Sequence, residues 1–246
     1  MNQFKGKQIV ITGASRGVGY QATKLFLAAG ASVIGTARSA AALDKVAPEF
    51  KALGSFTGFA CEQSDPAAPA QLGAAVAKLW DRVDILINNA AVQTWKKDWL
   101  DEGPALFEEH MRINVFAPHS TILALLPLVK KGTEPRIINV SSGAGTFKAL
   151  VETPDMPTYR LTKYTLNGLT ILWAGELKGL VAVNSLDPGW LKTDLGGPNA
   201  PGEPIDGGQR VLALAGLPFL LAGGLKIIYD LLIWRTFRKV KVERSA

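Results

Sequence analysis

The chain has 246 residues, 48% of them apolar, which is enough for one sizeable α/β domain and does not require two. Its 27 basic and 21 acidic residues give a net charge of +6, and residues 235–246, with five basic residues and one acid, carry +4 of it. The body of the chain is therefore not a basic nucleic-acid surface, and we expect no nucleic-acid partner.

The first predicted element is an apolar strand at residues 8–13, and the stretch before it lacks the hydrophobic region of a signal peptide. We therefore expect a cytoplasmic protein. Directly after this strand stands TGASRGVGY, whose three glycines lead into a helix that Gly30 ends. Glycines between a strand and a helix let the backbone approach a pyrophosphate, which the helix N-terminus attracts. A tight strand–helix turn would use the same glycines, so the loop favours a nucleotide site only together with its context.

The second predicted strand, residues 32–38, ends on Arg38, and no acid follows until Asp44. In NAD-binding folds an acid at this place binds the ribose 2′-hydroxyl, whereas an arginine can bind a 2′-phosphate through two hydrogen bonds. Arg16 in the glycine loop could reach the same phosphate. These residues predict NADP(H) as the cofactor, and the alternative for Arg38 is a solvated surface arginine.

The third predicted strand, residues 55–62, contains Cys61, the single cysteine of the chain. It cannot form an internal disulfide, which fits a reducing compartment. Because no motif surrounds it and the chain has only two histidines, we interpret Cys61 as a buried strand thiol and not as a nucleophile. No histidine and cysteine residues have the spacing of metal ligands, so we expect no metal site.

The remaining elements continue the alternation of strands and helices. Helical patterns occur at 41–50 (broken near Pro48), 69–80, 106–131 and 158–177, and strand patterns at 83–91, 136–142 and 180–189. The strand runs are continuously apolar, as expected when both faces of a parallel sheet are covered. The sequence therefore predicts an α/β single-domain Rossmann fold, a doubly wound parallel sheet with helices on both faces.

Two Tyr-x-x-x-Lys pairs occur in the helical segments, Tyr20 with Lys24 and Tyr159 with Lys163. A spacing of four places both side chains on one face of a helix, so spacing alone does not separate the two pairs. Only the second pair follows a strand that ends on serines, at Ser142. We therefore predict chemistry for Tyr159 and Lys163, a surface position for Lys24, and a packing role or a flank of the cofactor site for Tyr20.

Six motifs, in order between residue 7 and about residue 195, resemble those of the short-chain dehydrogenase/reductase family. They are TGASRGVG at 12–19, NNAA at 88–91, Asn114 in MRINVFAP, NVSS at 139–142, YRLTK at 159–163 and DPGWLKT at 187–193. The resemblance implies an oxidoreductase that uses NADP(H) and a small-molecule carbonyl substrate. It also implies a homodimer or homotetramer formed through the helices at 106–131 and 158–177.

The resemblance assigns catalytic roles to four residues. Tyr159 is the general acid that protonates the carbonyl oxygen, and Ser142 hydrogen-bonds that oxygen. Lys163 binds the nicotinamide ribose and lowers the pKa of the tyrosine, while Asn114 holds a water that links Lys163 to solvent. The residues implied to bind the cofactor are Gly13, Ser15, Arg16, Gly17, Val18, Gly19, Arg38, Glu62, Gln63, Asn89, Ala90, Tyr159, Lys163, Pro188, Gly189 and Thr193.

Elementary acid–base chemistry agrees with the role of Tyr159. A free tyrosine has a pKa of ~10, too high for efficient acid–base work at neutral pH. Lowering it by about three units needs roughly 4 kcal/mol of preference for the phenolate. A lysine ammonium on the next helical turn, together with the positive nicotinamide ring of the oxidised cofactor, could supply that preference.

The chain departs from the family pattern in three places. Glu62 stands where many relatives have an aspartate that binds the adenine amino group. The interval between Ser142 and Tyr159 is a few residues longer than in many relatives, which we expect to alter the rim of the substrate pocket. Residues 196–209, rich in glycine and proline, are interpreted as the substrate-covering loop, with hinges that suit a lid.

The C-terminal part departs furthest. We predict a Rossmann-type NADP-binding and catalytic core at 1–195, followed at 196–246 by the covering loop and an atypical C-terminal segment of the same domain. A helix is expected at about 208–216. Residues 211–225 are uncharged but shorter than the ~18 residues of a spanning helix. We interpret the segment as core or subunit interface; the alternative is peripheral membrane contact through residues 225–246.

Aromatic residues occur near the predicted strand ends, where open α/β sheets bind ligands. We predict substrate contacts for Phe147, Trp190 and Trp95, which favour an apolar carbonyl compound; Trp95 and Trp99 could instead pack on the next helix. The predicted function is reversible NADPH-dependent reduction of a ketone or aldehyde to an alcohol, similar to carbonyl reductases. The alternatives are a 3-oxoacyl-thioester or steroid reductase and, in another class, a non-catalytic NADP-binding regulator.

Overall fold

The computed structural model describes residues 3–95, 98–153 and 155–217. Met1–Gly216 form one compact unit, and Leu217–Ala246 form a second, of which only Leu217 is described. The membrane alternative, for residues 225–246, therefore falls outside the described residues. Of the segment interpreted as core or subunit interface, only residues 211–217 are described, and Val211 and Ala215 are buried in the core. The division of the chain at residue 195 stays a prediction.

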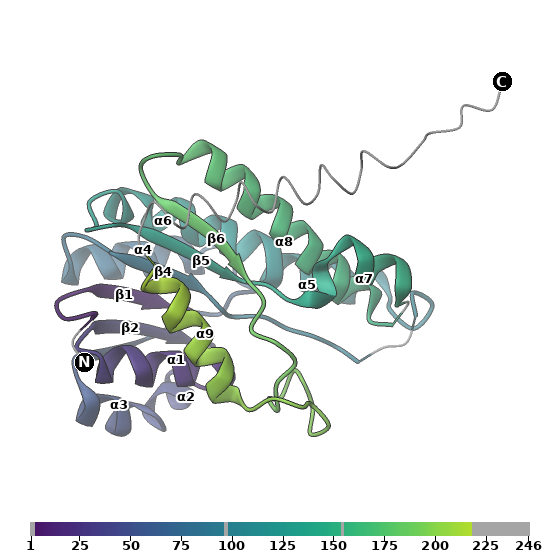
Figure 1. Ribbon diagram of the computed structural model, residues 1–246, viewed down its shortest axis with the longest axis horizontal. Helices are drawn as coiled ribbons and strands as arrows, with labels where there is room; N and C mark the ends of the chain where they lie inside the picture. The colour runs from purple at the N-terminus through teal and green to yellow at the C-terminus, as the bar shows by residue number, and fades with distance from the viewer. Residues whose placement is uncertain (1–2, 96–97, 154, 218–246) are drawn as a thin grey trace. The chain divides into compact units, whose positions relative to one another are not determined.

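The described strands form one parallel sheet in the order β3-β2-β1-β4-β5-β6 (Figure 1). They are β1 Gln8–Ile11, β2 Ser32–Ala37, β3 Phe56–Ala60, β4 Ile85–Asn88, β5 Arg136–Val140 and β6 Ala182–Leu186. In this order the chain works outward from β1 to one edge and then returns to β4 at its other side. The predicted doubly wound Rossmann fold is confirmed.

Helices connect the strands at nearly the predicted places. They are α1 Gly17–Ala28, α2 Ala40–Asp44, α3 Ala47–Leu53, α4 Ala68–Leu79, α5 Pro104–Met111, α6 Ala117–Val129, α7 Phe147–Glu152, α8 Pro157–Glu176 and α9 Pro204–Ala215. The break near Pro48 separates α2 from α3, because proline in a first helical turn has no N–H that needs a partner. The long stretch predicted at 106–131 is two helices joined by a π-helical turn, Arg112–Phe116.

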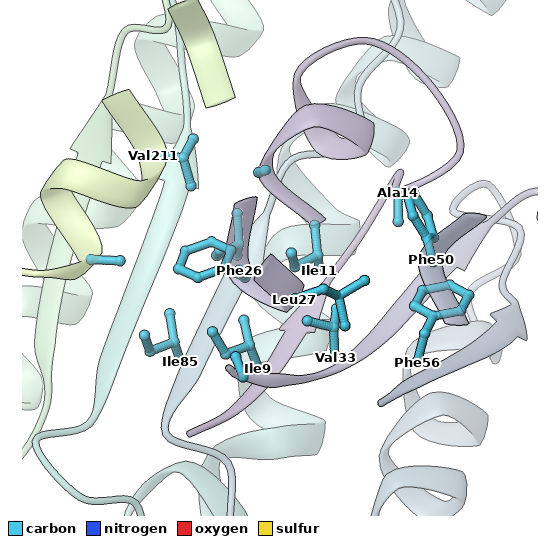
Figure 2. Packing of buried hydrophobic residues seen from close by; sticks show 14 of the residues in the cluster. Ile9, Ile11, Ala14, Phe26, Leu27, Val33, Phe50, Phe56, Ile85 and Val211 are labelled. Carbon is cyan, nitrogen blue, oxygen red and sulfur yellow. The ribbon is translucent and has the colours of Figure 1, made fainter. Parts of the chain in front are cut away.

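Alternate residues of the central strands enter two hydrophobic clusters, one on each face of the sheet. Ile9 and Ile11 of β1 pack in one cluster with Phe26 of α1 and Val211 of α9 (Figure 2). Val10 lies in the other cluster, with residues of α4, α6 and α8. Successive strand side chains point to opposite faces, so a sheet buried on both faces needs a continuous apolar strand.

Polar contacts fasten the amino ends of the strands. The Asp84 carboxylate, fully buried before β4, accepts from the backbone N–H of Gln8 at 2.7 Å and of Thr133 at 2.6 Å. At the start of β5, Arg136 Nη1 donates to the Leu214 carbonyl of α9 at 2.9 Å. These contacts stabilise the sheet at the amino ends of its strands. The loops at the opposite, carboxyl ends carry the residues singled out from the sequence.

Candidate active site

A cleft of about 710 Å³ lies at the carboxyl ends of the strands. Loops that follow all the described strands contribute to its lining. Ligands of open α/β sheets bind at the carboxyl ends of the strands, near the point where the strand order reverses. The cleft brings together most of the predicted site residues: Gly13, Ser15, Arg16, Gly17, Val18, Arg38, Glu62, Gln63, Asn89, Ala90, Trp95, Ser142, Tyr159, Lys163, Pro188, Gly189, Trp190 and Thr193.

The glycine loop after β1 leaves no room for a side chain at Gly13 or Gly19. Gly13 has a φ of +70°, and a Cβ on Gly19 would lie 2.1 Å from the Gly13 carbonyl oxygen, so Gly19 packs beneath the loop without lining the cleft. From the loop after β4, Asn89 Nδ2 donates to the carbonyl oxygens of Thr12 at 2.9 Å and Gly13 at 3.1 Å. The loop is thus a rigid backbone cradle at the N-terminus of α1, which fits the diphosphate of a dinucleotide.

The two arginines predicted to bind a 2′-phosphate differ in their partners. Arg38 is exposed at the cleft and forms no ion pair with any described residue. Arg16 forms an ion pair with Asp194, from the loop after β6, and both side chains are more than half exposed. Arg38 is therefore the arginine whose full charge is available to an anion.

The turn after β3 holds the residues predicted near the adenine. Glu62 accepts from the Ser64 N–H at 3.2 Å, and Gln63 Nε2 donates to the Cys61 sulfur at 3.2 Å. Cys61 directly follows β3, is 3% exposed, and has its pKa raised to about 11 by burial. The prediction of a buried thiol is confirmed, and burial disfavours the thiolate, which is the reactive form.

Three of the predicted catalytic residues meet at the cleft. Tyr159 and Lys163 lie in the first two turns of α8, and Lys163 Nζ lies 5.8 Å from the centroid of the tyrosine ring. Lys163 Nζ also donates to the Val140 carbonyl of β5 at 2.9 Å. Ser142, which follows β5, also lines the cleft and lies near enough to the phenol of Tyr159 to lower its pKa. A tight contact brings this loop onto α8, since a Cβ on Gly145 would lie 2.6 Å from the Lys163 carbonyl carbon.

The fourth predicted catalytic residue, Asn114, lies behind the cleft in the π-helical turn. It is fully buried, and its side chain exchanges two hydrogen bonds of 2.9 Å with the backbone of Val92. It also donates to Thr162 Oγ1 at 3.0 Å. Asn114 thus joins the loop after β4 to α8, and π-helical turns are frequent at functional sites. Its role in holding a water stays a prediction.

Burial decides the acid–base properties of the catalytic pair in the protein itself. It raises the pKa of Tyr159 to about 12, against the effect of Ser142, which lowers it, and the Asp187 carboxylate raises it further. Burial also lowers the pKa of Lys163 to about 8. From the sequence we expected Lys163 and the positive nicotinamide ring together to lower the pKa of Tyr159. In the polypeptide alone the pKa moves the other way, because desolvation of the phenolate is the largest effect.

The aromatic residues divide into two groups. Trp95 and Trp190, each about half exposed, line the cleft, and Trp190 Nε1 donates to the Gly196 carbonyl at 2.7 Å. Phe147 begins α7, a helix that was not predicted, and is 60% exposed outside the cleft lining. Trp99 also lies outside and contacts Phe107 of α5, with ring centroids 6.2 Å apart, so the packing interpretation holds for Trp99.

Sequence reasoning missed a charged corner beside Tyr159. Arg160 is 7% exposed, and its Nε donates to the Asp155 backbone carbonyl at 2.6 Å and to the Asp155 carboxylate at 3.1 Å. Between Asp155 and α8 stands Met156, a non-glycine residue with a φ of +51°. All three line the cleft. The one available signal was an arginine in the helical stretch directly after the predicted acid.

Comparison with known proteins identifies relatives along most of the chain. A model of the short chain dehydrogenase family matches residues 7–203. The uncharacterised oxidoreductase YvrD of Bacillus subtilis is 34% identical over 188 residues, which cover 76% of this chain and 69% of that protein. The rhamnolipids biosynthesis 3-oxoacyl-(acyl-carrier-protein) reductase of Pseudomonas aeruginosa is 33% identical over 189 residues, covering 75% and 72%.

Solved structures give the same picture. The Pseudomonas aeruginosa RhlG/NADP active-site complex superposes with a TM-score of 0.79 at 28% identity, over 88% of this chain and 92% of that one. A metagenomic short-chain oxidoreductase in complex with NADP superposes with a TM-score of 0.77 at 30% identity, over 88% and 94%.

Proposed function

The chain belongs to the short-chain dehydrogenase family, and from this premise we propose that it reduces the carbonyl group of a ketone or aldehyde to an alcohol, with NADPH as reductant. One observation carries the proposal: Tyr159, Ser142 and Lys163 meet in the same cleft as the glycine loop after β1. The reaction is reversible, so the same residues would serve alcohol oxidation.

The proposed cofactor is NADP(H), which supplies the hydride when bound. The backbone cradle of the glycine loop fits a diphosphate, and Arg38, which forms no ion pair with a described acid, offers its guanidinium to a 2′-phosphate. Two solved relatives are complexes with NADP. Lys163, with two N–H groups beyond the one that Val140 accepts, would hold the nicotinamide ribose.

Tyr159 would donate its phenolic proton to the carbonyl oxygen. With a pKa of about 12 the phenol stays protonated throughout the neutral range, as an acid must. The alkoxide formed by reduction is a stronger base than phenolate, so this proton transfer is favourable. Ser142 would donate a hydrogen bond to the same oxygen and stabilise the charge that develops there.

Lys163 would stabilise the phenolate left on Tyr159. Lys163 Nζ lies 5.8 Å from the centroid of the tyrosine ring, and two unit charges at about that separation attract by about 3 kcal/mol at an effective dielectric constant of about 20. The burial that raises the tyrosine pKa by about two units disfavours the phenolate by about the same amount. Lys163 therefore offsets the effect of burial during turnover, while the phenol remains neutral between turnovers.

A second candidate is reduction of a 3-oxoacyl thioester. The relative from Pseudomonas aeruginosa that is 33% identical over 189 residues carries that activity in its name. Half-exposed Trp95 and Trp190 at the cleft would also suit an acyl chain. A non-catalytic NADP-binding regulator is less well supported, because such a protein would not need Ser142, Tyr159 and Lys163 together.

An NADPH-oxidation screen tests these proposals. The purified chain is given NADPH with ketones, aldehydes and 3-oxoacyl thioesters, and NADH at equal concentration serves as the comparison. We expect oxidation of NADPH with at least one carbonyl class, which also separates the two candidates. Binding of NADPH without turnover of any substrate class would favour the regulator, and a preference for NADH would contradict the assignment of Arg38.

We also propose a homodimer or homotetramer formed through α6 and α8. Tyr164, Ile171 and Leu172 form an exposed apolar stripe on α8, and Phe116 and Leu123 lie exposed along α6 and the turn before it. Such a patch marks an association surface.

Light scattering tests the oligomer. The wild type should have at least twice the mass of one chain, and Leu172→Glu should reduce it to one chain. Leu79→Glu, at an exposed leucine of α4, is the matched control and should leave the mass unchanged. A monomeric wild type, or an unchanged mass for Leu172→Glu, would contradict the proposal.

A further inference from the structure

The helix that carries Tyr159 begins without a cap of its own. Its N-cap residue, Met156, is left-handed, with φ +51° and ψ +48°, and makes no capping hydrogen bond. The first turn of α8 also contains no acid. The first N–H groups of a helix have no partner within it, and a capping acceptor stabilises the first turn. The first turn of α8 therefore depends on a partner from elsewhere in the chain.

Glu102 supplies that partner from the loop before α5. Its Oε2 accepts from the Thr158 N–H at 2.9 Å, across 56 residues of sequence. Glu102 is 7% exposed and Thr158 is fully buried, so water does not compete for this hydrogen bond. A carboxylate at a helix N-terminus also interacts favourably with the helix dipole. Glu102 thus performs the capping that Met156 does not.

The turn that presents Glu102 is itself held in place. The Asp98 carboxylate accepts from the N–H groups of Leu100 at 3.0 Å and Asp101 at 3.1 Å. The Glu102 N–H donates to the Trp99 carbonyl at 3.3 Å. The carboxylate therefore approaches α8 from an ordered turn, which is what a fixed capping distance requires.

The residues before Thr158, Asp155 and Met156, are held by side chains other than Glu102. Arg160 hydrogen-bonds Asp155, and Gln93 Nε2 donates to the Met156 sulfur at 2.8 Å. A left-handed conformation is strained for a non-glycine residue and persists only where its surroundings determine it. Tyr159 stands between the two supports, after the residue that Glu102 holds and before Arg160.

We propose that Glu102 is a positioning residue for Tyr159: its carboxylate fixes the first turn of α8, and with it the phenol that protonates the substrate. Glu102 does not line the cleft, so it acts only through the helix. The reaction named here rests on the proposed function, whereas the contact between Glu102 and Thr158 does not.

Three variants of Glu102 and one control test the proposal. Glu102→Ala removes the acceptor, Glu102→Gln keeps an acceptor oxygen at the same reach, and Glu102→Asp keeps the charge but shortens the reach. Glu109→Ala, at an exposed acid of α5, is the matched control. Should Glu102→Ala not accumulate as folded protein, Glu102→Asp takes its place with a loss in the same direction.

Two measurements on these variants are needed. The first is kcat and KM for carbonyl reduction with the Kd for NADPH. We expect Glu102→Ala to lower kcat by about 10- to 100-fold, because small misplacements of a catalytic group have effects of that size. KM and the Kd for NADPH should stay within about twofold, as expected when cofactor binding is untouched, and Glu102→Gln should restore most of kcat. The second is hydrogen exchange of the Thr158 amide, which should become faster only in Glu102→Ala and Glu102→Asp.

The outcomes separate the two proposals. A wild-type kcat in Glu102→Ala overturns the positioning role, and so does an unchanged exchange rate at Thr158. Equal losses in Glu102→Ala and Glu102→Gln overturn it as well, because the acceptor oxygen would then be irrelevant. A wild type that reduces no carbonyl compound overturns the proposed function, and the exchange rates alone then decide whether Glu102 holds α8.

Discussion

Two Tyr-x-x-x-Lys pairs in this molecule have the same spacing and opposite surroundings. In α1, Lys24 Nζ lies 5.4 Å from the centroid of the Tyr20 ring, and in α8 the corresponding distance from Lys163 to Tyr159 is 5.8 Å. Helix geometry alone produces that likeness. The difference between the pairs therefore lies in what the rest of the chain places around them.

The α1 pair is tied to an acid at the surface. Glu49 of α3 accepts from the Tyr20 hydroxyl and forms an ion pair with Lys24 Nζ at 2.6 Å, which raises the pKa of the lysine. Tyr20 also packs on Phe50, with ring centroids 5.2 Å apart. This pair joins α1 to α3, so of the two roles predicted for Tyr20 the packing role fits.

The α8 pair is buried, and among the described residues no acid forms an ion pair with Lys163. Burial lowers the pKa of Lys163 to about 8 and raises that of Tyr159 to about 12. The α8 pair lines the cleft, where a substrate could take a proton from Tyr159, whereas the α1 pair lies outside the cleft lining. Burial and partners, and not spacing, distinguish chemistry from structure here.

Removing the two phenols should give the largest difference between the pairs. Tyr159→Phe should lower kcat by about 10²- to 10⁴-fold, the usual contribution of a general acid. Tyr20→Phe should leave kcat within about twofold, because Tyr20 contacts Glu49 and Phe50 and not the cleft. Steady-state NADPH oxidation measures both, and equal effects of the two substitutions would break the comparison.

Removing the two lysines should separate the pairs by the pH dependence of stability. Between pH 8 and pH 10.5 the unfolded chain keeps a proton on Lys163 that the folded chain releases, so stability rises with pH in that window. From pH 8 to pH 9.5 the wild type should gain about 2 kcal/mol in free energy of unfolding relative to Lys163→Met. Tyr159 works in the opposite direction only from about pH 10 upward, where the unfolded chain loses its phenolic proton first.

Urea unfolding at these two pH values measures the gain. Lys24→Met serves as the matched variant and should run parallel to the wild type, because Glu49 raises the pKa of Lys24. Parallel curves for the wild type and Lys163→Met would contradict the assignment of a lowered lysine pKa.

Arg38 provides a contrast to the catalytic pair, because it should bind the cofactor without taking part in the reaction. Arg38→Ser should raise KM for NADPH about tenfold, the loss of a charge-assisted hydrogen bond. KM for NADH and kcat should change little. Kinetics with both cofactors measure the effect, and an unchanged ratio of the two KM values would show that Arg38 is only a surface residue.

The smallest expected effect concerns the acid of the α1 pair. Glu49→Ala removes the partner of both Tyr20 and Lys24 but leaves kcat unchanged. Its loss of thermal stability should be small, since the acid is exposed and surface ion pairs contribute little. Thermal unfolding with a parallel kcat measurement checks this, and a reduced kcat would mean that the α1 pair takes part in catalysis.

The local pattern predicted the fold and the residues that line the cleft. Continuous apolar strands, the glycine loop and the Tyr-x-x-x-Lys motif are short-range signals, and each is found where it was expected. Residue contacts between distant segments could not be read in the same way. The capping of Thr158 by Glu102 spans 56 residues, and the ion pair between Arg16 and Asp194 joins the loop after β1 to the loop after β6.

The acid–base properties of the site were the hardest to predict. The sequence shows a lysine beside a tyrosine but not how deeply both are buried, and burial is the largest influence on each pKa. Helix α7 escaped prediction because its six residues carry no periodic apolar pattern. Phe147, which begins this helix, is exposed and does not line the cleft as predicted.

One isotope measurement tests the central claim, that Tyr159 completes a hydride transfer from the cofactor to a carbonyl carbon. The wild type, Tyr20→Phe and Tyr159→Phe are each supplied with NADPH deuterated at the transferable position and with the best carbonyl substrate. Mass spectrometry should find one deuterium on the alcohol carbon with the wild type and Tyr20→Phe, and almost no alcohol with Tyr159→Phe. Labelled alcohol at undiminished yield from Tyr159→Phe, or unlabelled alcohol from the wild type, would contradict the account.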